Sequence, residues 1–380
     1  MAAKTIALTD GASVLRWSRK VGTEAIWKSL FFRPDYGFVG TGMNNMIVRK
    51  EELADRIGGG KLTCTLTMQM TGDGLVDGAS AEGSESSYDH FTDAFEVHEL
   101  GSEPFAVKSQ LDQQYVEWDL VQQGKNVVSD WWSVPLNAGP AMCLGGATFT
   151  SALDYYKPHG RLVRAGSTDG LGNQYTMMNT STVPSTGRLF LANGVANAQT
   201  LSTTNPIDLD DIDELIDTAP QTKPPMRPAK WSGGEHFIIF LHTDQWSDLM
   251  TSTRYDAIIQ SLLQGGQPYE KNTWGTGNAI PYRNCCFVVS NWNPPAQNSS
   301  TAAALANSRV AFMCGAQALM VGWGQGHAQN RFRWHIEPYN IGGSKRMIAR
   351  SMWGGKKTVY NSKDYAVLAL ATSATNRGDA

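Results

Sequence analysis

The chain has 380 residues, a formal net charge of -3 and 41% hydrophobic residues. That length exceeds one typical domain and supplies enough apolar side chains for one large core or two small ones. The slightly acidic balance excludes a generally basic coat for nucleic acid. Charged residues make up only 18%, below the usual quarter, whereas 38 glycines and 12 tryptophans are plentiful. We therefore expect broad, partly polar surfaces that other molecules cover.

The cysteines indicate a reducing compartment. They are Cys64, Cys143, Cys285, Cys286 and Cys314, an odd number without the C-x-x-C spacing of a metal knuckle. We interpret them as free thiols of a protein that is made and folded in a cytoplasm. No apolar run follows a basic start, which argues against a signal peptide. No window approaches the ~18 apolar residues of a membrane span.

The first predicted element is an amphipathic helix at residues 10–30, which Asp10 can cap. One side carries Val14, Trp17, Val21, Ala25 and Ile26, and the other sides carry Arg16, Arg19, Lys20 and Lys28. Two interpretations stay open. The helix is either a basic arm that reaches another molecule or an ordinary first helix that packs on its own domain.

An extended, acidic excursion is predicted next. Apolar and polar residues alternate strictly from 61 to 70, which is typical of a half-buried strand. Residues 71–87 form a loop by composition, and 88–100 resume an extended character. Between Leu62 and Val107 there is no Lys or Arg but there are nine acids: Asp73, Asp77, Glu82, Glu85, Asp89, Asp93, Glu96, Glu99 and Glu103. Such a run is either a solvated surface or one half of an electrostatic docking pair.

A long helix between Pro104 and Pro135 is the central prediction. Its core positions at helical spacing are Leu111, Trp118, Val121, Val128 and Trp132. At ~1.5 Å per residue, a helix over residues 105–134 would be about 40 Å long. A helix of that length needs a body to lie against. A core helix of an α/β enzyme is the alternative interpretation of the same pattern.

Beyond Pro135 the predicted elements are shorter. We expect an acidic helix at 208–216, a buried strand at 236–241, a helix at 243–250 that Thr243 caps, a helix at 254–263, and a buried apolar element at 302–322. The five acids of the 208–216 segment could suggest a calcium loop. The alternating ligands and the central glycine of such a loop are missing, so we interpret the segment as a helix.

The last fifty residues combine two predicted strands, at 332–336 and 365–372, with a Gly-rich basic connection. From residue 331 to residue 363 there are eight bases: Arg331, Arg333, Lys345, Arg346, Arg350, Lys356, Lys357 and Lys363. Glu337 is the single acid among them. The segment therefore mirrors the acidic excursion in charge, as two surfaces that dock against each other would.

No catalytic motif emerges from the sequence. The Gly-Lys runs at 58–61 and 354–357 lack the upstream glycine of a phosphate loop, and neither His-Glu-x-x-His nor Gly-x-Ser-x-Gly occurs. A glycoside hydrolase or a carbohydrate-binding protein stays open, because Trp-rich chains with scattered carboxylates can bind sugars. Nothing selects one carboxylate pair. A structural protein without a cofactor or metal requires fewer assumptions.

Several short motifs occur in an order that resembles a known family. They are LRWSRK at 15–20, Glu24, residues 55–70, TGDG at 71–74, EGSE at 82–85, PMRP at 225–228, QWSDL at 245–249, GAQA at 315–318 and GGKKTVYNSKDY at 354–365. This order resembles the major capsid proteins of tailed bacteriophages. Within them it is most similar to the coat family of short-tailed phages that carry a giant virion RNA polymerase.

The resemblance implies an α+β chain with the Hong Kong 97 phage coat fold. Its expected parts are an N-terminal arm (1–60), an extended loop (61–104), a spine helix of the peripheral domain (105–138), an axial domain with connecting strands (139–328) and peripheral return strands (329–380). It also implies a non-enzymatic protein of the virion. Copies would self-assemble in the host bacterial cytoplasm into an icosahedral head shell that encloses double-stranded DNA.

The predicted subunit interface pairs the acidic loop with basic surfaces. Its residues are Asp73, Asp77, Glu82 and Glu85 on one side, and Arg16, Arg19, Lys20, Arg346, Arg350, Lys356 and Lys357 on the other. The partners that the resemblance implies are other copies in hexamers and pentamers, a separate scaffolding protein and a portal. A decoration protein stays open. Packaged DNA would be contacted non-specifically, and no membrane is involved.

Overall fold

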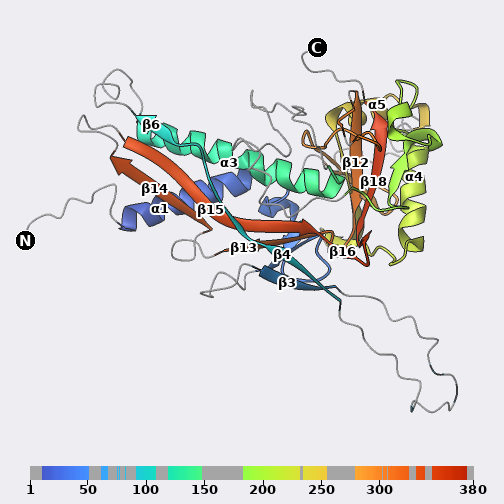
Figure 1. Ribbon diagram of the computed structural model, residues 1–380, viewed down its shortest axis with the longest axis horizontal. Helices are drawn as coiled ribbons and strands as arrows, with labels where there is room; N and C mark the ends of the chain where they lie inside the picture. Colours follow the sequence, from blue (N-terminus) through green and yellow to red (C-terminus); the bar gives the residue numbers. More distant parts are fainter. Residues whose placement is uncertain are drawn as a thin grey trace, which may run out of the picture.

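Two mixed β-sheets and one long helix organise the molecule (Figure 1). The computed structural model describes residues 11–50, 61–66, 75, 77, 82, 91–107, 119–147, 183–231, 234–254, 279–301, 303–305, 307–324, 331–338 and 345–374. The long helix, α3 (Leu120–Gly145), runs beside the first sheet and reaches the second at its C-terminal end. Within the described part of the chain, no helix is long and apolar enough to cross a membrane.

The first sheet is built around one strand of 13 residues, β15 (Lys345–Lys357). Its order is β1 (Val39–Gly40), β2 (Ile47–Lys50), β13 (Leu319–Trp323), β15 and β14 (Phe332–Pro338), and β5 (His98–Gly101) and β6 (Phe105–Val107) also pair with β15. Inward side chains such as Trp334 and Trp353 pack with residues of α3 and of α1 (Gly11–Lys28). One face of the sheet is therefore covered by helices.

The second sheet is buried on both faces. Its order is β10 (Ala279–Tyr282), β11 (Cys285–Val289), β9 (Gly234–Leu241), β12 (Ser308–Cys314), β18 (Val367–Ser373) and β7 (Leu189–Leu191), with β8 (Ala229–Trp231) on β9. Ile239 and Leu241 pack in a core with α4 (Leu209–Thr218) and α5 (Thr243–Met250), whereas Ile238 and Phe240 join the core shared with α3. Burial on both sides explains why these strands are continuous apolar runs.

Smaller elements complete the fold. They are the hairpin of β3 (Lys61–Leu66) and β4 (Phe91–Glu96), the pair β16 (Val359–Tyr360) and β17 (Lys363–Asp364), and the 3-10 turns at Pro34–Tyr36, Ala192–Gly194, Ala198–Thr200 and Ala219–Gln221. The predicted strand at 61–70 is confirmed for residues 61–66. Its apolar face, Leu62, Cys64 and Leu66, is buried as expected.

The long helix exists, but its predicted bounds of 105–134 were wrong. Residues Phe105–Val107 form a strand because they pair with β15, and this tertiary pairing overrides their helical spacing. Asp119 caps the described helix, accepting a hydrogen bond from the backbone N–H of Val121 at 2.8 Å. The helix then continues through Pro135 and Pro140 to Gly145. A helical proline costs ~3 kcal/mol, and complete burial of this half of the helix outweighs that cost.

The predicted core positions of the helix divide into three groups. Val128 and Trp132 are buried, which confirms their assignment. Val121 is half-buried and packs against the same core. Leu111 and Trp118 lie outside the described residues.

The N-terminal helix packs on its own chain. Of the two interpretations from the sequence, residues 11–28 therefore form an ordinary first helix and not an arm that reaches another molecule. Buried Lys125 of α3 contacts Glu24 of α1 at 2.5 Å, and Lys28 contacts Asp130 at 2.5 Å. The Ser18 hydroxyl accepts the backbone N–H of Trp334 at 2.9 Å. These contacts attach α1 to both α3 and the first sheet.

The C-terminal segment was predicted as two strands around a connection, and this was wrong in one respect. The basic connection is itself strand β15, the axis of the first sheet, whereas β18 belongs to the second sheet. The predicted buried element at 302–322 is likewise two strands, β12 and β13, in different sheets. The glycines in this segment led to its prediction as a connection. Gly354 is required there for close packing, because a Cβ at this position would lie 2.1 Å from the Glu96 carbonyl oxygen.

The other predicted elements agree more closely. Helix α4 begins after a capping box of Asp208 and Asp211, and β9 includes the predicted strand at 236–241. Helix α5 has its predicted bounds, but its cap is His242 and not Thr243. Of the helix predicted at 254–263, only Arg254 lies within the described residues.

All five cysteines are buried and free, in agreement with the expected reduced thiols. Burial raises the pKa of Cys286 to about 12, and burial is also the main cause that raises the pKa of Cys143, Cys285 and Cys314.

Thiolate is the reactive form, so we expect no thiol of the native protein to react with a thiol reagent at pH 8. Five should react after denaturation, and one fast-reacting group in native protein would contradict this.

His242 makes the fold sensitive to acid. Burial, and then repulsion from Arg309, lower its pKa from 6.5 to about 3, although the Asp244 carboxylate lies 3.1 Å from Nδ1. The geometry agrees with a neutral ring, because Nδ1 accepts the Asp244 backbone N–H at 3.2 Å. Since the unfolded state binds the extra proton below pH 6.5, stability is complete above that pH and falls as pH drops towards 3.

We therefore expect a loss of about 2 kcal/mol from this group between pH 7 and pH 5. His242→Asn keeps a side-chain cap but cannot titrate, so its unfolding free energy should fall less over the same range. Urea unfolding of the unassembled subunit at both pH values measures the difference. If the unfolding free energies of the two proteins fall by the same amount between pH 7 and pH 5, His242 is not the cause of the loss.

Candidate functional site

The exposed face of the β14–β15 ribbon brings arginines together. Arg333 lies directly opposite Arg350 in the strand register, and both are exposed. Like charges at directly opposed positions destabilise a sheet. The guanidinium of Arg350 lies 3.7 Å from the Glu99 carboxylate, a long contact for an ion pair. Arg346, on the same face, lies opposite Glu337. This surface therefore favours an anionic partner.

The acidic excursion is neutralised at its base by its own chain. Asp93 contacts Lys356 at 2.5 Å, Glu96 contacts Lys61 at 3.2 Å, and Glu99 contacts Arg350. Farther along the excursion, Asp77 and Glu82 are exposed. Asp73 and Glu85 lie outside the described residues. The charge asymmetry of the sequence is thus partly an internal pairing at the base of the hairpin.

Two lysines that were predicted at the subunit interface face inward. Lys357 is 2% exposed and its Nζ lies 2.8 Å from Asp364, which is 3% exposed, so the prediction for Lys357 was wrong. Lys356 is half-buried against Asp93. Both residues lie where β15 ends at the junction with the second sheet, and no spacing rule shows that a terminal strand segment is enclosed there.

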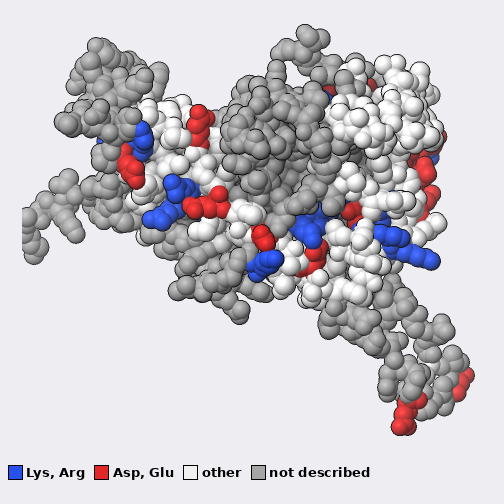
Figure 2. All heavy atoms as spheres, viewed as in Figure 1, with Lys and Arg blue, Asp and Glu red and all other residues white. Residues whose placement is uncertain are grey.

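Helix α1 presents a second basic surface. Arg16, Arg19 and Lys20 are exposed, and their spacing places them on one side of the helix. The Lys20 ammonium lies 5.5 Å from the Trp17 ring. On the face drawn in Figure 2, basic and acidic side chains lie beside one another, so these surfaces are local features of a mixed exterior.

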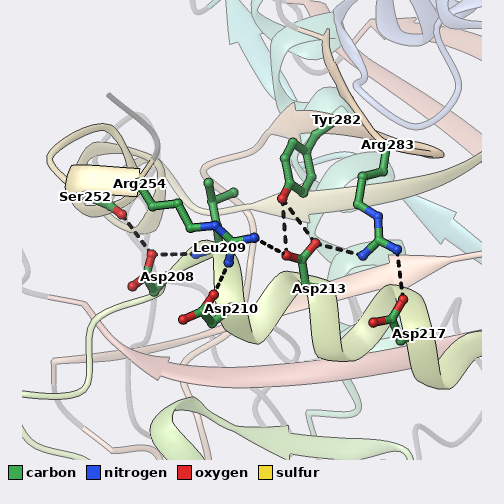
Figure 3. Close-up of polar contacts among 9 residues, drawn as sticks. All are labelled: Asp208, Leu209, Asp210, Asp213, Asp217, Ser252, Arg254, Tyr282 and Arg283. Carbon is green, nitrogen blue, oxygen red and sulfur yellow. Dashed lines mark hydrogen bonds and ion pairs between the residues drawn. The ribbon is translucent and has the colours of Figure 1, made fainter. Parts of the chain in front are cut away.

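A network of ion pairs, which the sequence did not reveal, covers the outer side of α4 (Figure 3). Asp213 accepts hydrogen bonds from Arg254 at 2.7 Å, from Arg283 at 2.9 Å and from the Tyr282 hydroxyl at 3.1 Å. Arg254 also contacts Asp210, and Arg283 contacts Asp217 at 3.0 Å. Acids at helical spacing were a visible signal, but their partners come from distant segments.

The contacts of this network show how the acids of residues 208–216, which could suggest a calcium loop, are used in the folded chain. Arginines engage two of these carboxylates, those of Asp210 and Asp213, and the Asp208 carboxylate accepts the Ser252 hydroxyl at 2.8 Å. Among the described residues, no group of three or more His, Cys, Asp or Glu side chains could hold a metal ion. The arrangement holds α4 in place and does not resemble a binding site for a cation.

The geometry defines a class of protein before any comparison. Two sheets share a long helix, and a hairpin is attached where the sheets meet. A family model described as phage capsid protein matches residues 5–375, so the chain belongs to the phage capsid protein family. It is a major capsid protein of a tailed phage that forms the head shell, a structural role in the virion. The hydrolase alternative is therefore excluded.

Solved structures show the same fold. The capsid of Ralstonia phage GP4 has a TM-score of 0.72 at 18% identity, with 100% of both chains covered. The Cyanophage Pam1 capsid has a TM-score of 0.64 at 17% identity, covering 93% of this chain and 94% of that one. The head of Helicobacter pylori bacteriophage KHP40 has a TM-score of 0.59 at 13% identity, covering 90% and 91%. No curated protein matches the sequence. The expected Hong Kong 97 type coat fold is confirmed.

Proposed function

We propose that copies of this chain join as hexamers and pentamers in an icosahedral shell around DNA, and that the acidic loop of one copy lies over the basic face of the next. The observation that carries the proposal is the opposed pair Arg333 and Arg350 on an exposed sheet face. An acidic segment relieves the repulsion of such a pair. Asp77 and Glu82, with Asp73 and Glu85 of the same loop, supply it.

Repetition makes this contact effective. An exposed ion pair contributes only ~0–1 kcal/mol. In a closed symmetric assembly the same contact recurs in every copy, and complementary charge also steers each association step. The receiving surface in this proposal consists of Arg333, Arg346 and Arg350. The α1 surface of Arg16, Arg19 and Lys20 is the second candidate receiver.

We also assign the parts of the coat to the two sheets. The first sheet with α1 and α3 corresponds to the peripheral domain, and the second with α4 and α5 to the axial domain. Strand β18 supports a boundary different from 329–380, because it pairs within the second sheet. A separate scaffolding protein, a portal and non-specific contact with packaged DNA complete the proposal, with a decoration protein as an optional addition.

Membership in the group of phages with a giant virion RNA polymerase is a finer proposal. The order of motifs from LRWSRK to GGKKTVYNSKDY supports it. Mass spectrometry of virions that contain this coat protein tests it. A giant RNA polymerase inside the particle is expected, and virions without any such protein would contradict the assignment.

Charge reversal tests the docking proposal. Changing Asp73, Asp77, Glu82 and Glu85 together to Lys should leave the circular dichroism and melting of the subunit nearly unchanged, because exposed charges contribute little to folding. Assembly should be abolished or misdirected. Reversing Arg333, Arg346 and Arg350 to Glu in the same protein should restore part of it, whereas reversing Arg16, Arg19 and Lys20 should not.

A matched control separates this contact from net charge. The double variant Asp77→Lys, Glu82→Lys changes the net charge by the same amount as the control double variant Glu214→Lys, Glu235→Lys. All four residues are exposed. Only the first pair should impair assembly. High salt should weaken wild-type intermediates, since the Debye length falls from ~10 Å at 0.1 M to ~3 Å at 1 M. Normal shells from the charge-reversed loop would refute the docking proposal.

A further inference from the structure

The chain crosses between the two sheets at two places that lie against each other. Residues 315–318 lead from β12 to β13, and residues 358–366 lead from β15 back to β18. The Gly315 N–H donates to the Ala366 carbonyl at 2.9 Å, and the Thr358 N–H donates to the Ala318 carbonyl at 3.2 Å. The two crossings therefore form a single joint between the sheets.

Gln317 lies at the centre of this joint and is 0% exposed. Its N–H donates to the Asn45 carbonyl at 2.8 Å, and its carbonyl accepts the Thr358 hydroxyl at 2.5 Å. Its side-chain Nε2 donates to the Thr65 carbonyl at 3.2 Å, and its Oε1 accepts from Arg227 at 3.3 Å. One residue thus bonds the turn before β2, the strand β3, the segment before β8 and the return crossing.

The backbone of Gln317 is held in an unfavourable conformation. Its φ of 60° lies in the left-handed region, which a residue with a Cβ atom adopts only where the surrounding structure holds it there. Glycine would adopt this conformation without that constraint. A glutamine at this position is explained by the use of its side chain, because both polar ends of the amide are bonded to segments from opposite sides of the joint.

The acidic excursion is anchored on the same joint. Asp93 of β4 accepts from Lys356 and, at 3.2 Å, from the Val359 N–H, so it bonds the start of the return crossing. Phe91 packs edge-to-face on Tyr360 with ring centroids 4.4 Å apart. With the bond from Gln317 to Thr65, both strands of the hairpin are attached where the sheets meet.

We propose that Gln317 is a positioning residue that sets the angle between the two sheets, and with it the direction of the excursion, and so determines the curvature of the shell. A closed shell needs nearly the same subunit geometry in every copy, so a small spread of this angle produces particles of mixed size. The inference rests on shell formation, which family membership shows, and is independent of how the loops dock.

The test is the shape of the particles formed by Gln317→Gly. This change relieves the backbone and removes both side-chain bonds, so the subunit should stay folded and should still assemble. Electron microscopy should show shells of several diameters, tubes or open sheets where the wild type forms one size. The matched control is Gln245→Ala. Gln245 is also 0% exposed. Its side chain bonds Arg309 and Thr372 of the second sheet and the His242 N–H at the start of α5, and it makes none of the hydrogen bonds of the joint. Its loss should lower the melting temperature without changing the particle diameter.

A second variant keeps the test decisive if Gln317→Gly does not fold. Thr358→Val preserves the shape of the side chain and removes the hydroxyl bonds to the Gln317 and Ala318 carbonyls, so it should broaden the distribution of particle sizes. Thr358→Ser keeps the hydroxyl, so its particles should have the wild-type size distribution. Uniform particles of wild-type diameter from every folded variant of the joint would overturn the proposal. Equal broadening by Gln245→Ala would overturn it too, since a general loss of stability would then be the cause. Failure of loop docking is distinguished by the compensating reversal of Arg333, Arg346 and Arg350, which should restore part of the assembly lost by the charge-reversed loop and should not narrow the size distribution of the joint variants.

Discussion

Replacing Trp132 with alanine is expected to cost ~3–5 kcal/mol of unfolding free energy and to leave mostly insoluble protein. The indole is fully buried where α3 meets the first sheet. It packs edge-to-face on Phe332 with centroids 4.9 Å apart, and its N–H donates to the Ala349 carbonyl at 3.2 Å. Truncation leaves a large cavity and removes one of two hydrogen bonds to the Ala349 carbonyl, which keeps the Ser102 N–H at 2.8 Å.

The matched control is Trp27→Ala on α1. Trp27 is 44% exposed, so its truncation should change the unfolding free energy by well under the loss at Trp132. Urea unfolding of the soluble fraction measures both. Trp132→Phe should fall between wild type and alanine, because it keeps most of the apolar volume and loses the hydrogen bond. A soluble Trp132→Ala subunit with wild-type stability would mean that the packing of α3 is misplaced.

The second large effect is expected at the buried pair of Lys357 and Asp364. Removing one member of a buried ion pair leaves an uncompensated charge and typically costs ~3–5 kcal/mol. Lys357→Met should show this loss, since the remaining Asp364 carboxylate keeps mainly the Ser185 N–H, at 3.1 Å, to stabilise it. The exposed pair of Lys28 and Asp130 is the control, and Lys28→Met should cost less than ~1 kcal/mol.

A double variant shows whether the charge itself is responsible. Asp364→Asn removes the charge and still offers an oxygen to Ser185, so Lys357→Met with Asp364→Asn should recover part of the stability lost in Lys357→Met alone. Denaturant unfolding of the four proteins gives the coupling energy of the pair. Additive losses would indicate that the two groups do not interact and that Lys357 is held by packing alone.

Local chemistry predicted several elements correctly. The alternation at 61–66 placed Leu62, Cys64 and Leu66 inward, because the period of a strand is a local property. The acidic helix predicted at 208–216 is present as α4, and Asp208 caps it within its own turn. Trp132 and Val128 were assigned to the core from helical spacing alone. These positions need no knowledge of the distant chain.

The predictions that failed concern segments whose structure depends on distant partners. Phe105–Val107 is a strand only because β15 lies beside it, and α3 tolerates two prolines only because its second half is enclosed. Lys357 looked like one base in an exposed run, yet Asp364 and Cys143 surround it at the junction. Charge counts cannot distinguish a base on a surface from a base in a buried pair.

The sequence by itself determined the class of this protein, through the order of its motifs, and those elements whose pattern is local: the amphipathic first helix, the β3 strand, the cap of α4 and the apolar stripe of α3. Only the tertiary structure decided which strands share a sheet, which charged side chains form ion pairs inside the subunit and where the sheets are joined. The physical reason is that pairing and burial are relations between residues far apart in the chain. Gln317 illustrates this, because its four partners lie in segments that no local pattern connects.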